Sequence, residues 1–354
     1  MSEGPVHNLA FSALLPSQLR NLRDRRYQGE SFDVSVAALS PADQIHVRTL
    51  YRFAKGVYGR WIEMRDAPDW EALRASVLSV LRPPLSISMK ELGQESMARC
   101  GEGEAERALG KVLHDLRGGA LMPLQLYAQM AEWDADPIHL RTAAFLARDQ
   151  AKIMRNALPD LDPEVRRADE TEKPHYIQAV VDKWDGFRFE REGHEPGHVR
   201  VTCTYGGLLA SCCLEASAVD RIVYNYMNNA MRFASGPVIS MEIVPIGHHA
   251  VRWIVANPVT PEQVDWLKKK TGGDLTCLFR GGVTRGGNGL GLSNCVDFVA
   301  AAFGLPDIES ALSGKYLGAV VKDGWFLAWA HWPSLYSAEA PQQPGVQPAP
   351  RPAP

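Results

Sequence analysis

A histidine next to a carboxylate is the first feature of this sequence with residue types that could do chemistry. His114 and Asp115 lie in the segment KVLHDLRGGAL, and a pair of glycines, Gly118 and Gly119, follows them. A neutral imidazole, whose ordinary pKa is about 6.5, can attack a phosphoryl group at neutral pH, and an adjacent carboxylate can accept a proton from the ring and hold its orientation. Each glycine costs about 1 kcal/mol relative to alanine inside a helix, which indicates a local need for flexibility or close approach. Although a single helical histidine usually has no catalytic role, we predict His114 and Asp115 as the catalytic pair.

A second group of candidate residues lies in the helix-forming segment AVDRIVYNYMNNAMRFA. Apolar residues form one face of this helix, and Asn225, Asn229 and Arg232 fall on the opposite face at positions i, i+4 and i+7. Solvated helix faces are normally built from Glu, Lys, Gln and Arg, whereas asparagine is a poor helix former. An amide oxygen suits Mg²⁺, and a guanidinium suits phosphate. The pattern therefore favours ligand-binding side chains over a merely solvated polar face.

A glycine-dense loop, FRGGVTRGGNGLGLSNC, leads into an apolar helix that we expect over 290–303. Backbone N–H groups that no side chain shields, followed by the N-terminus of a helix, form a cradle for phosphate. The loop lacks the Gly-Lys-Ser/Thr sequence of a P-loop. Its G-x-G-x-G spacing at Gly287, Gly289 and Gly291 also differs from the G-x-G-x-x-G of a dinucleotide fold. Alone, the loop is a weak indication of phosphate binding.

Two antiparallel helices are expected to position the histidine. Apolar residues recur every three or four positions between 104 and 158, with one interruption at 134–137. We predict one unbroken helix before the interruption and a second helix that begins at Pro137. His114 lies off the apolar stripe, so we expect it to face solvent. Two such helices bury little apolar surface alone, and a second copy of the chain would complete a four-helix bundle.

The whole sequence predicts an α+β protein of four parts. These are a mainly helical N-terminal domain of unknown role, the helical hairpin, a domain with helices on one face of a mixed or antiparallel sheet, and a disordered proline-rich tail, at 1–103, 104–160, 161–335 and 336–354. In the first part, helices are expected to start at Pro41 and near Asp69. In the third part, Asp323-Gly324 between two apolar runs predicts a β-hairpin.

Taken together and in this order, the three segments resemble the sensor histidine kinases of two-component signalling. KVLHDLRGGAL is similar to the histidine box, YNYMNNAMRFA to the asparagine box, and GGNGLGLSNC to the second glycine box of the ATP-binding domain. The resemblance covers about residues 105–333. It implies a helical hairpin for dimerisation and phosphotransfer, followed by an ATP-binding α/β sandwich of the GHKL type.

The resemblance also implies an activity and a site. It implies that His114 accepts a phosphoryl group from Mg-ATP with Asp115 as its acid–base partner, and that the group then passes to an aspartate in the receiver domain of a response regulator. It further implies that the protein is a homodimer through its hairpin and that Asn229 would hold Mg²⁺. The residues implied to bind ATP are Asn225, Asn229, Arg232, Asn257, Thr284, Gly287, Gly289 and Gly291.

The chain departs from the pattern of the family at its first glycine box, Asp-x-Gly-x-Gly, which is degenerate here, and at the two glycines after the histidine. The proline that the family usually places five residues after the histidine is Gly119. The strand VRWIVAN ends at Asn257, where the family places an aspartate that accepts a hydrogen bond from adenine, and a neutral amide oxygen is a weaker acceptor. Gly118 stands where kinases with phosphatase activity place Thr or Asn, so we predict weak phosphatase activity toward the receiver. A histidine phosphotransferase that has lost ATP binding and a dimeric scaffold that binds other kinases are therefore alternative interpretations.

Composition argues against several other classes of protein. The 354 residues include 38 Lys and Arg against 41 Asp and Glu, which is a net charge of −3, so the chain lacks the basic excess typical of nucleic-acid binding. Its six cysteines form no C-x-x-C pair, which disfavours a zinc site and fits a reducing compartment. No run approaches the ~18 apolar residues of a membrane span, and no signal peptide is recognisable. We therefore expect a cytoplasmic protein that binds neither nucleic acid nor membrane.

Overall fold

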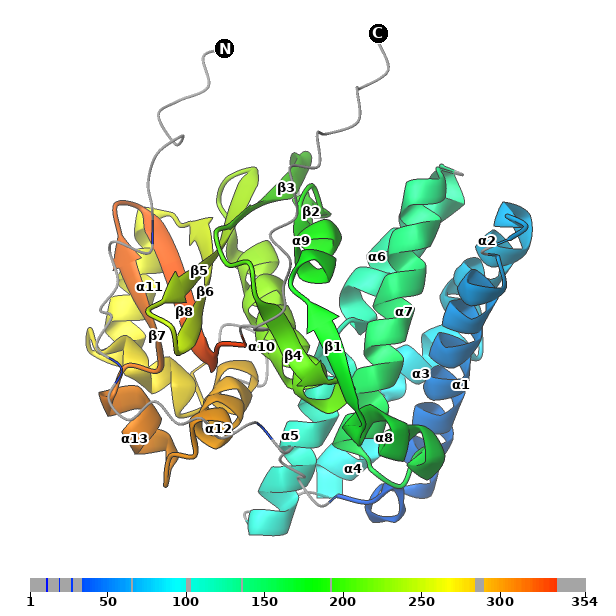
Figure 1. Cartoon of the computed structure of the whole chain (residues 1–354), viewed down its shortest axis with the longest axis horizontal. Coiled ribbons are helices and arrows are strands. Elements are labelled where there is room, and N and C mark those ends of the chain that lie inside the picture. Colours follow the sequence, from blue (N-terminus) through cyan, green and yellow to red (C-terminus); the bar gives the residue numbers. More distant parts are fainter. Residues whose placement is uncertain are drawn as a thin grey trace, which may run out of the picture.

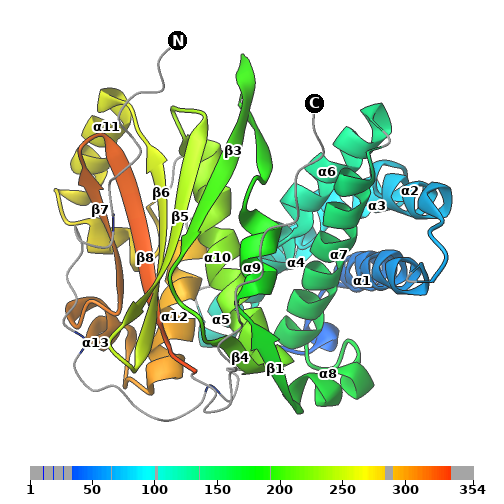
Figure 2. The ribbon, with the colours of Figure 1, turned by 45° about the horizontal axis from the view of Figure 1, so that its top comes forward.

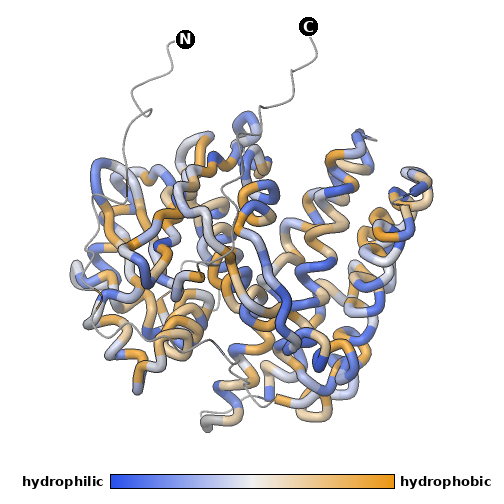
Figure 3. The backbone as a smooth tube through the Cα atoms, in the orientation of Figure 1, coloured by the Kyte–Doolittle hydropathy of each residue, from blue (hydrophilic) through white to orange (hydrophobic). Residues whose placement is uncertain are grey.

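The computed structural model has a group of helices on one side and a sheet with its own helices on the other (Figure 1). It describes residues 11, 19, 27, 34–64, 66–99, 103–134, 136–191, 193–283 and 290–335, so the predicted tail at 336–354 lies outside the described residues. One apolar core extends through both halves, and apolar residues recur along the helices of each (Figure 3). None of the described helices is long and apolar enough to cross a membrane.

The N-terminal part is helical, as the sequence predicts. Its elements are η3 (Val36–Ala38), α1 (Pro41–Glu63), α2 (Trp70–Leu78), η4 (Ser79–Leu81), α3 (Leu85–Glu91) and α4 (Gln94–Arg99). Pro41 is the first residue of α1, and the Ser40 side chain caps this helix by accepting a hydrogen bond from the Asp43 N–H at 3.1 Å. The Asp69 side chain caps α2 in the same way, with the Ala72 N–H as donor. Both predicted helix starts are confirmed.

The helical hairpin differs from the prediction at its glycine pair. The hairpin consists of α5 (Glu104–Gly118), α6 (Leu121–Trp133) and α7 (Pro137–Ala157). The predicted unbroken first helix is wrong, because the chain turns at Gly119, whose backbone has φ −7° and ψ −129°. Gln150 of α7 bridges the break, since its Nε2 donates to the Leu116 carbonyl at 2.8 Å and its Oε1 accepts from the Ala120 N–H at 3.0 Å. Gly119 therefore permits α7 to approach the break closely.

Two Gly→Ala substitutions in these helices are expected to change the free energy of unfolding in opposite directions. A Cβ atom at Gly119 would lie 2.8 Å from Gln150 Oε1 and 3.0 Å from the Asp115 carbonyl oxygen. Gly119→Ala should therefore destabilise the fold by about 1–3 kcal/mol. Gly56 is exposed in α1 with no atom within 4 Å of an added Cβ, so Gly56→Ala should stabilise the fold by about 1 kcal/mol. Urea unfolding of both variants beside wild type measures the difference, and equal midpoints would contradict the prediction.

A six-stranded mixed sheet is the centre of the second half (Figure 2). The strand order is β2-β3-β5-β6-β8-β7, in which β3 and β5 run parallel and the other neighbours are antiparallel. The strands are β2 (Arg188–Arg191), β3 (His194–Cys203), β5 (Val238–Ile246), β6 (Ala250–Pro258), β7 (Leu317–Lys322) and β8 (Trp325–Pro333). Asp323 and Gly324, at φ 52° and 79°, form the predicted tight turn between β7 and β8. A separate small sheet pairs β1 (Glu172–Tyr176) with β4 (Leu208–Cys212).

Helices cover one face of the six-stranded sheet, which gives the predicted α+β layering. The two helices that pack most centrally on this face are α10 (Cys213–Phe233) and α12 (Gly291–Phe303), and Figure 2 shows them behind the strands. They correspond to the two helices that the sequence predicts in this domain. The remaining helical elements are α8 (Pro163–Glu170), α9 (Gln178–Trp184), α11 (Pro261–Thr271), η5 (Leu275–Phe279) and α13 (Ile308–Ser313).

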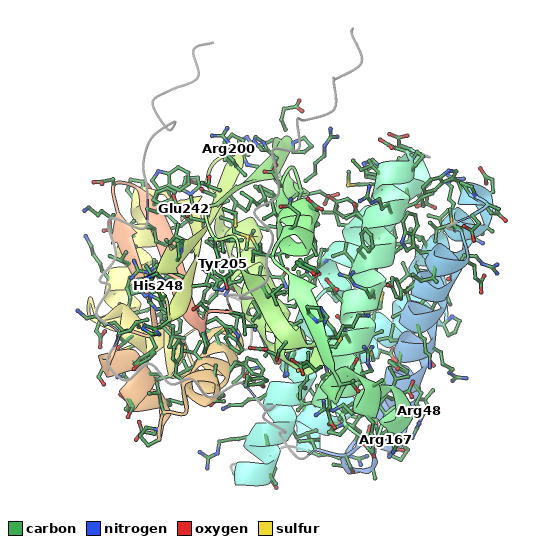
Figure 4. All side chains as sticks on the ribbon, viewed as in Figure 1. Arg48, Arg167, Arg200, Tyr205, Glu242 and His248 are labelled. Atoms are coloured by element: carbon green, nitrogen blue, oxygen red, sulfur yellow. The ribbon has the colours of Figure 1, made fainter. Side chains whose placement is uncertain are left out.

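The opposite face of the sheet carries a second, smaller apolar cluster. In it Phe11, from the N-terminal region, packs with Ile254, Leu327 and Trp329. The backbone N–H of Phe11 also donates to Oε1 of Glu242 at 3.0 Å. Glu242 belongs to β5 and is labelled on the sheet in Figure 4. Phe11 therefore packs on the face of the sheet opposite α10 and α12.

Buried charged groups join the hairpin to the sheet-containing half. Asp149 of α7 accepts a hydrogen bond from Lys183 Nζ of α9 at 2.7 Å and one from the Tyr224 hydroxyl of α10 at 3.0 Å. Asp220 of α10 accepts from Lys183 Nζ at 2.9 Å and also from Lys152 of α7. Burial would raise the pKa of both aspartates, but the neighbouring cations hold both pKa values below the ordinary range. The ion pairs therefore persist at neutral pH and fix α7 against α10.

Candidate functional site

One cavity of about 240 Å³ lies where α5 meets α10 and α12. Its polar lining residues are His114, Asn225, Asn228, Asn229, Arg232, Asn257 and Gln263. Its apolar lining includes Val255, Val259, Trp266, Leu267, Leu278, Val283, Leu292 and Phe326. The histidine, asparagine and glycine segments that the sequence singles out thus meet at a single cavity.

His114 lies in the wall of this cavity. Its side chain is 20% exposed, so the expectation that it faces open solvent is wrong. A Cβ atom added to Gly291, the first residue of α12, would lie 3.1 Å from His114 Cε1 and 3.4 Å from Nε2. The imidazole therefore stands against the first turn of α12. Helical periodicity correctly predicts that His114 lies off the apolar stripe of the hairpin. It does not reveal that α10 and α12 of the same chain pack on that side of α5.

Asp115 is buried and paired, and is not a solvated helix charge. Arg221 of α10 donates to its Oδ2 through Nε at 2.7 Å and also through Nη2, and Asn294 of α12 donates to its Oδ1 at 2.6 Å. His114 Nδ1 lies 3.4 Å from the same Oδ1. Burial alone would raise the pKa of Asp115, but the Arg221 guanidinium and the hydrogen bond from His114 lower it to about 2. A carboxylate with so low a proton affinity is suited to orienting His114 more than to removing a proton.

Contacts that the sequence did not reveal hold α5 against α10 and α12. Besides the Arg221–Asp115 pair, Lys111 Nζ lies 2.5 Å from Asp297 Oδ2, and Asn294 Nδ2 donates to the Lys111 carbonyl at 3.1 Å. Arg221 precedes Asn225 by four residues and extends the same polar face of α10. That spacing could have identified Arg221 from the sequence. No sequence pattern indicates that Asn294 and Asp297 contact α5.

The predicted asparagines reach the cavity from α10. Asn225 is buried, and a Cβ atom at Gly291 would lie 2.9 Å from its Oδ1. Asn229, one turn later, is half-buried, and Arg232 is exposed with its guanidinium over the Phe233 ring at 5.4 Å. The three side chains therefore follow one edge of the cavity in the order in which they occur along the helix.

Asn228 is a further cavity residue that the sequence did not single out. Its Nδ2 donates to the carbonyl oxygens of Gly118 and Gly119 at 3.1 and 3.2 Å, at the break between α5 and α6. Its Oδ1 is buried and has no hydrogen-bond partner among the described residues. Because buried polar atoms are normally paired, this oxygen fits a ligand that brings a donor or a cation into the cavity.

The N-terminus of α12 supplies the part of the glycine segment that the structure describes. The N-cap residue Leu290 has no side chain that could cap the helix, so among the described residues the first-turn N–H groups next to Gly291 have no capping side chain. A helix N-terminus of this kind can bind an anion such as phosphate. The other predicted residues of the segment, Thr284, Gly287 and Gly289, lie outside the described residues.

Asn257 is buried in the cavity wall at the end of β6. Its Nδ2 donates to the Pro258 carbonyl at 3.2 Å, which leaves the side-chain oxygen as the group that could accept a hydrogen bond from a ligand. The neighbouring strand places Phe326 opposite it, and Trp266 of α11 also lines the cavity. Apolar and aromatic side chains around one acceptor suit a flat heterocyclic ring.

Comparisons with known proteins give structural neighbours only. No family model and no curated protein matches the chain. Similar solved structures include the mycobacterial sensor histidine kinase MprB, which is 13% identical in sequence. The match covers 47% of this chain and 100% of the MprB chain, with a TM-score of 0.30. Full-length ShkA in complex with AMPPNP is 14% identical, and the match covers 71% of this chain and 46% of the ShkA chain, with a TM-score of 0.32. Histidine kinase AdeS of Acinetobacter baumannii is 12% identical, and the match covers 63% of this chain and 98% of the AdeS chain, with a TM-score of 0.27. MprB and AdeS are of the class that the motifs predict.

Proposed function

We propose that the protein is a two-component histidine kinase that transfers the γ-phosphoryl group of ATP to His114. The observation that carries this proposal is that His114, Asn225 and Gly291 meet at one cavity. They come from three segments far apart in the sequence. Stability of the fold does not require an imidazole, amide side chains and an uncapped helix N-terminus to share a cavity, whereas phosphoryl transfer to histidine does.

In the proposed reaction, Nε2 of His114 is the nucleophile. The ionised Asp115 accepts a hydrogen bond from Nδ1–H, which keeps the lone pair on Nε2. A bond forms between Nε2 and the γ-phosphorus, and the bond from phosphorus to the bridging oxygen breaks, so that ADP leaves with the electron pair. The phosphorylated ring is positively charged while it keeps Nδ1–H, and the Asp115 carboxylate stabilises that charge. Asp115 thus acts mainly by orientation and electrostatics.

The cavity residues fit a nucleotide with its metal. The apolar wall suits adenine, with the Asn257 oxygen as acceptor for its amino group, and Arg232 and the first turn of α12 suit phosphates. Asn229 is the residue that would hold Mg²⁺, and bound Mg²⁺ neutralises charge on the phosphates during transfer. The residues that we further propose along the triphosphate, on the resemblance of their segment, are Thr284, Gly287 and Gly289.

We propose an aspartate of a response-regulator receiver domain as the final acceptor and the cytoplasm as the compartment. The absence of a side chain at Gly118 supports weak phosphatase activity toward that receiver. The family resemblance implies a homodimer through the hairpin, but α1 and α2 of the same chain pack on α6 and α7, where a second hairpin would lie.

A histidine phosphotransferase or scaffold that binds ATP poorly is the second candidate. Asn257 favours it, because a neutral amide that is already hydrogen-bonded to Pro258 replaces the aspartate of the family. The uncapped N-terminus of α12 favours the kinase, since a protein that only relays phosphate between histidine and aspartate has no use for a nucleotide site.

Labelling with γ-labelled ATP and Mg²⁺ separates these candidates. A kinase should acquire acid-labile label on the wild-type protein and none on His114→Gln. His198→Gln is the matched control, because His198 is exposed on β3 and contributes nothing to the cavity lining, so this variant should label normally. Label acquired from a phosphorylated receiver but not from ATP would establish the phosphotransferase, and no label from either source would leave the scaffold.

A further inference from the structure

Helices α1 and α2 lie beside the hairpin, where the sequence predicts the hairpin of a second copy. The contacts form a ring, in which α1 packs on α7, α7 on α6, α6 on α2 and α2 on α1. Figures 1 and 2 show α1 and α2 on the side of α6 and α7 that faces away from the sheet. A four-helix arrangement is thus completed within one chain.

The apolar side of α7 is covered by this ring. Every residue of α7 from Thr142 to Ala157 is buried or half-buried. Helix α1 packs along α7, and Val47, Leu50 and Val57 of α1 belong to the apolar core, with each of them at most 2% exposed. Because α10 covers α7 on another side through the buried ion pairs, this stretch of α7 presents no exposed face to a second hairpin.

Polar contacts fix the N-terminal helices at both ends of the hairpin. Arg74 of α2 donates through Nε to the Ala131 carbonyl at 3.0 Å, and this is one of the last carbonyls of α6, which a helix end leaves unpaired. At the opposite end, the Tyr51 hydroxyl and Lys55 Nζ of α1 donate to Asp162 Oδ2 at 2.6 and 2.9 Å. The position of α1 and α2 is therefore specified by directional contacts in addition to apolar packing.

The acceptor and the cavity also belong to the same chain. His114 stands against Gly291, and the ion pair between Asp115 and Arg221 holds its helix on α10. No second chain is needed to bring the imidazole to the cavity. In a kinase that transferred phosphate between subunits, this place would be taken by the histidine of the partner.

We infer that residues 41–99 replace the hairpin of a partner, so that the protein works as a monomer in which His114 is phosphorylated by the cavity of its own chain. The monomer follows from the packing alone. Phosphorylation within the chain rests on the proposed function, and therefore each part has its own experiment.

Analytical ultracentrifugation of the full chain tests the first part. The expected result is one species of 39.1 kDa at every protein concentration. A species of twice that mass would overturn the inference, whether the copies pair through α6 or exchange α1 and α2. This measurement gives its answer even if the protein takes no label from ATP.

Mixing two inactive variants tests the second part. His114→Gln keeps the proposed nucleotide site but lacks the acceptor, and Asn229→Ala keeps the acceptor but lacks the proposed metal ligand. With transfer inside one chain, a mixture of the two should incorporate no more label than either alone, and the wild-type rate per molecule should not depend on protein concentration. Label restored in the mixture, or a rate per molecule that rises with concentration, would overturn the inference. Absence of label on the wild type would instead count against the proposed function.

Discussion

Gly291→Ala is expected to lower the rate of His114 phosphorylation by about 100-fold, because a displacement of about 1 Å at a reacting group can cost that much. The added methyl group would lie 2.9 Å from Asn225 Oδ1 and 3.1 Å from His114 Cε1. Both distances are shorter than ordinary contacts of a Cβ atom, and both neighbours belong to the proposed machinery. Either the nucleophile or the amide must therefore move away from its position in the cavity.

Initial rates with γ-labelled ATP measure this effect, and thermal unfolding shows whether the fold is retained. Gly206→Ala is the matched control, since Gly206 lies in the loop between β3 and β4 with no atom within 4 Å of an added Cβ. We expect that control to label like wild type. A Gly291→Ala protein that is folded and labels at the wild-type rate would show that the imidazole and the amide do not depend on this close spacing.

Local signals in the sequence were sufficient for several elements of the fold. The start of α1 is encoded in Ser40 and Pro41, and the turn between β7 and β8 in Asp323 and Gly324. Caps and tight turns depend on the backbone geometry of a few consecutive residues, so the residue types at those positions reveal them. The same holds for the three segments of the site, whose residue types and spacing could be recognised without knowing where they meet.

Contacts between distant segments could not be predicted from such local signals. The break at Gly119 depends on Gln150, which belongs to a different helix, and no residue near Gly119 indicates it. His114 was expected to face solvent because periodicity defines the face of a helix but not what packs on it. In the structure, Arg221 of α10 pairs with the buried Asp115 beside it, and this pairing suits Asp115 to be a fixed anion more than a proton acceptor.

Arg221→Met is expected to lower the free energy of unfolding by about 3–5 kcal/mol, because it leaves a buried carboxylate without its cation. The side chains of Arg221 and Asp115 are 4% and 1% exposed. Lys55→Met is the matched control, because it removes the cation of the Lys55–Asp162 pair, in which the lysine side chain is 58% exposed. That control should cost no more than about 1 kcal/mol. Urea unfolding of both variants beside wild type measures the difference.

Asp115→Asn in the Arg221→Met background should recover part of the lost stability, with an interaction energy of about 1–3 kcal/mol between the two sites.

The pH dependence of the free energy of unfolding tests the same ion pair independently. Arg221 and His114 together overcome the effect of burial and lower the pKa of Asp115 from 3.8 to about 2, so its contribution to stability is present above about pH 4 and is lost as the pH falls toward 2. Asp115→Asn should lack that loss. If Arg221→Met unfolds at the wild-type urea concentration, the pair does not hold α5 on α10, and the position of His114 must then depend on the neighbouring contact between Lys111 and Asp297.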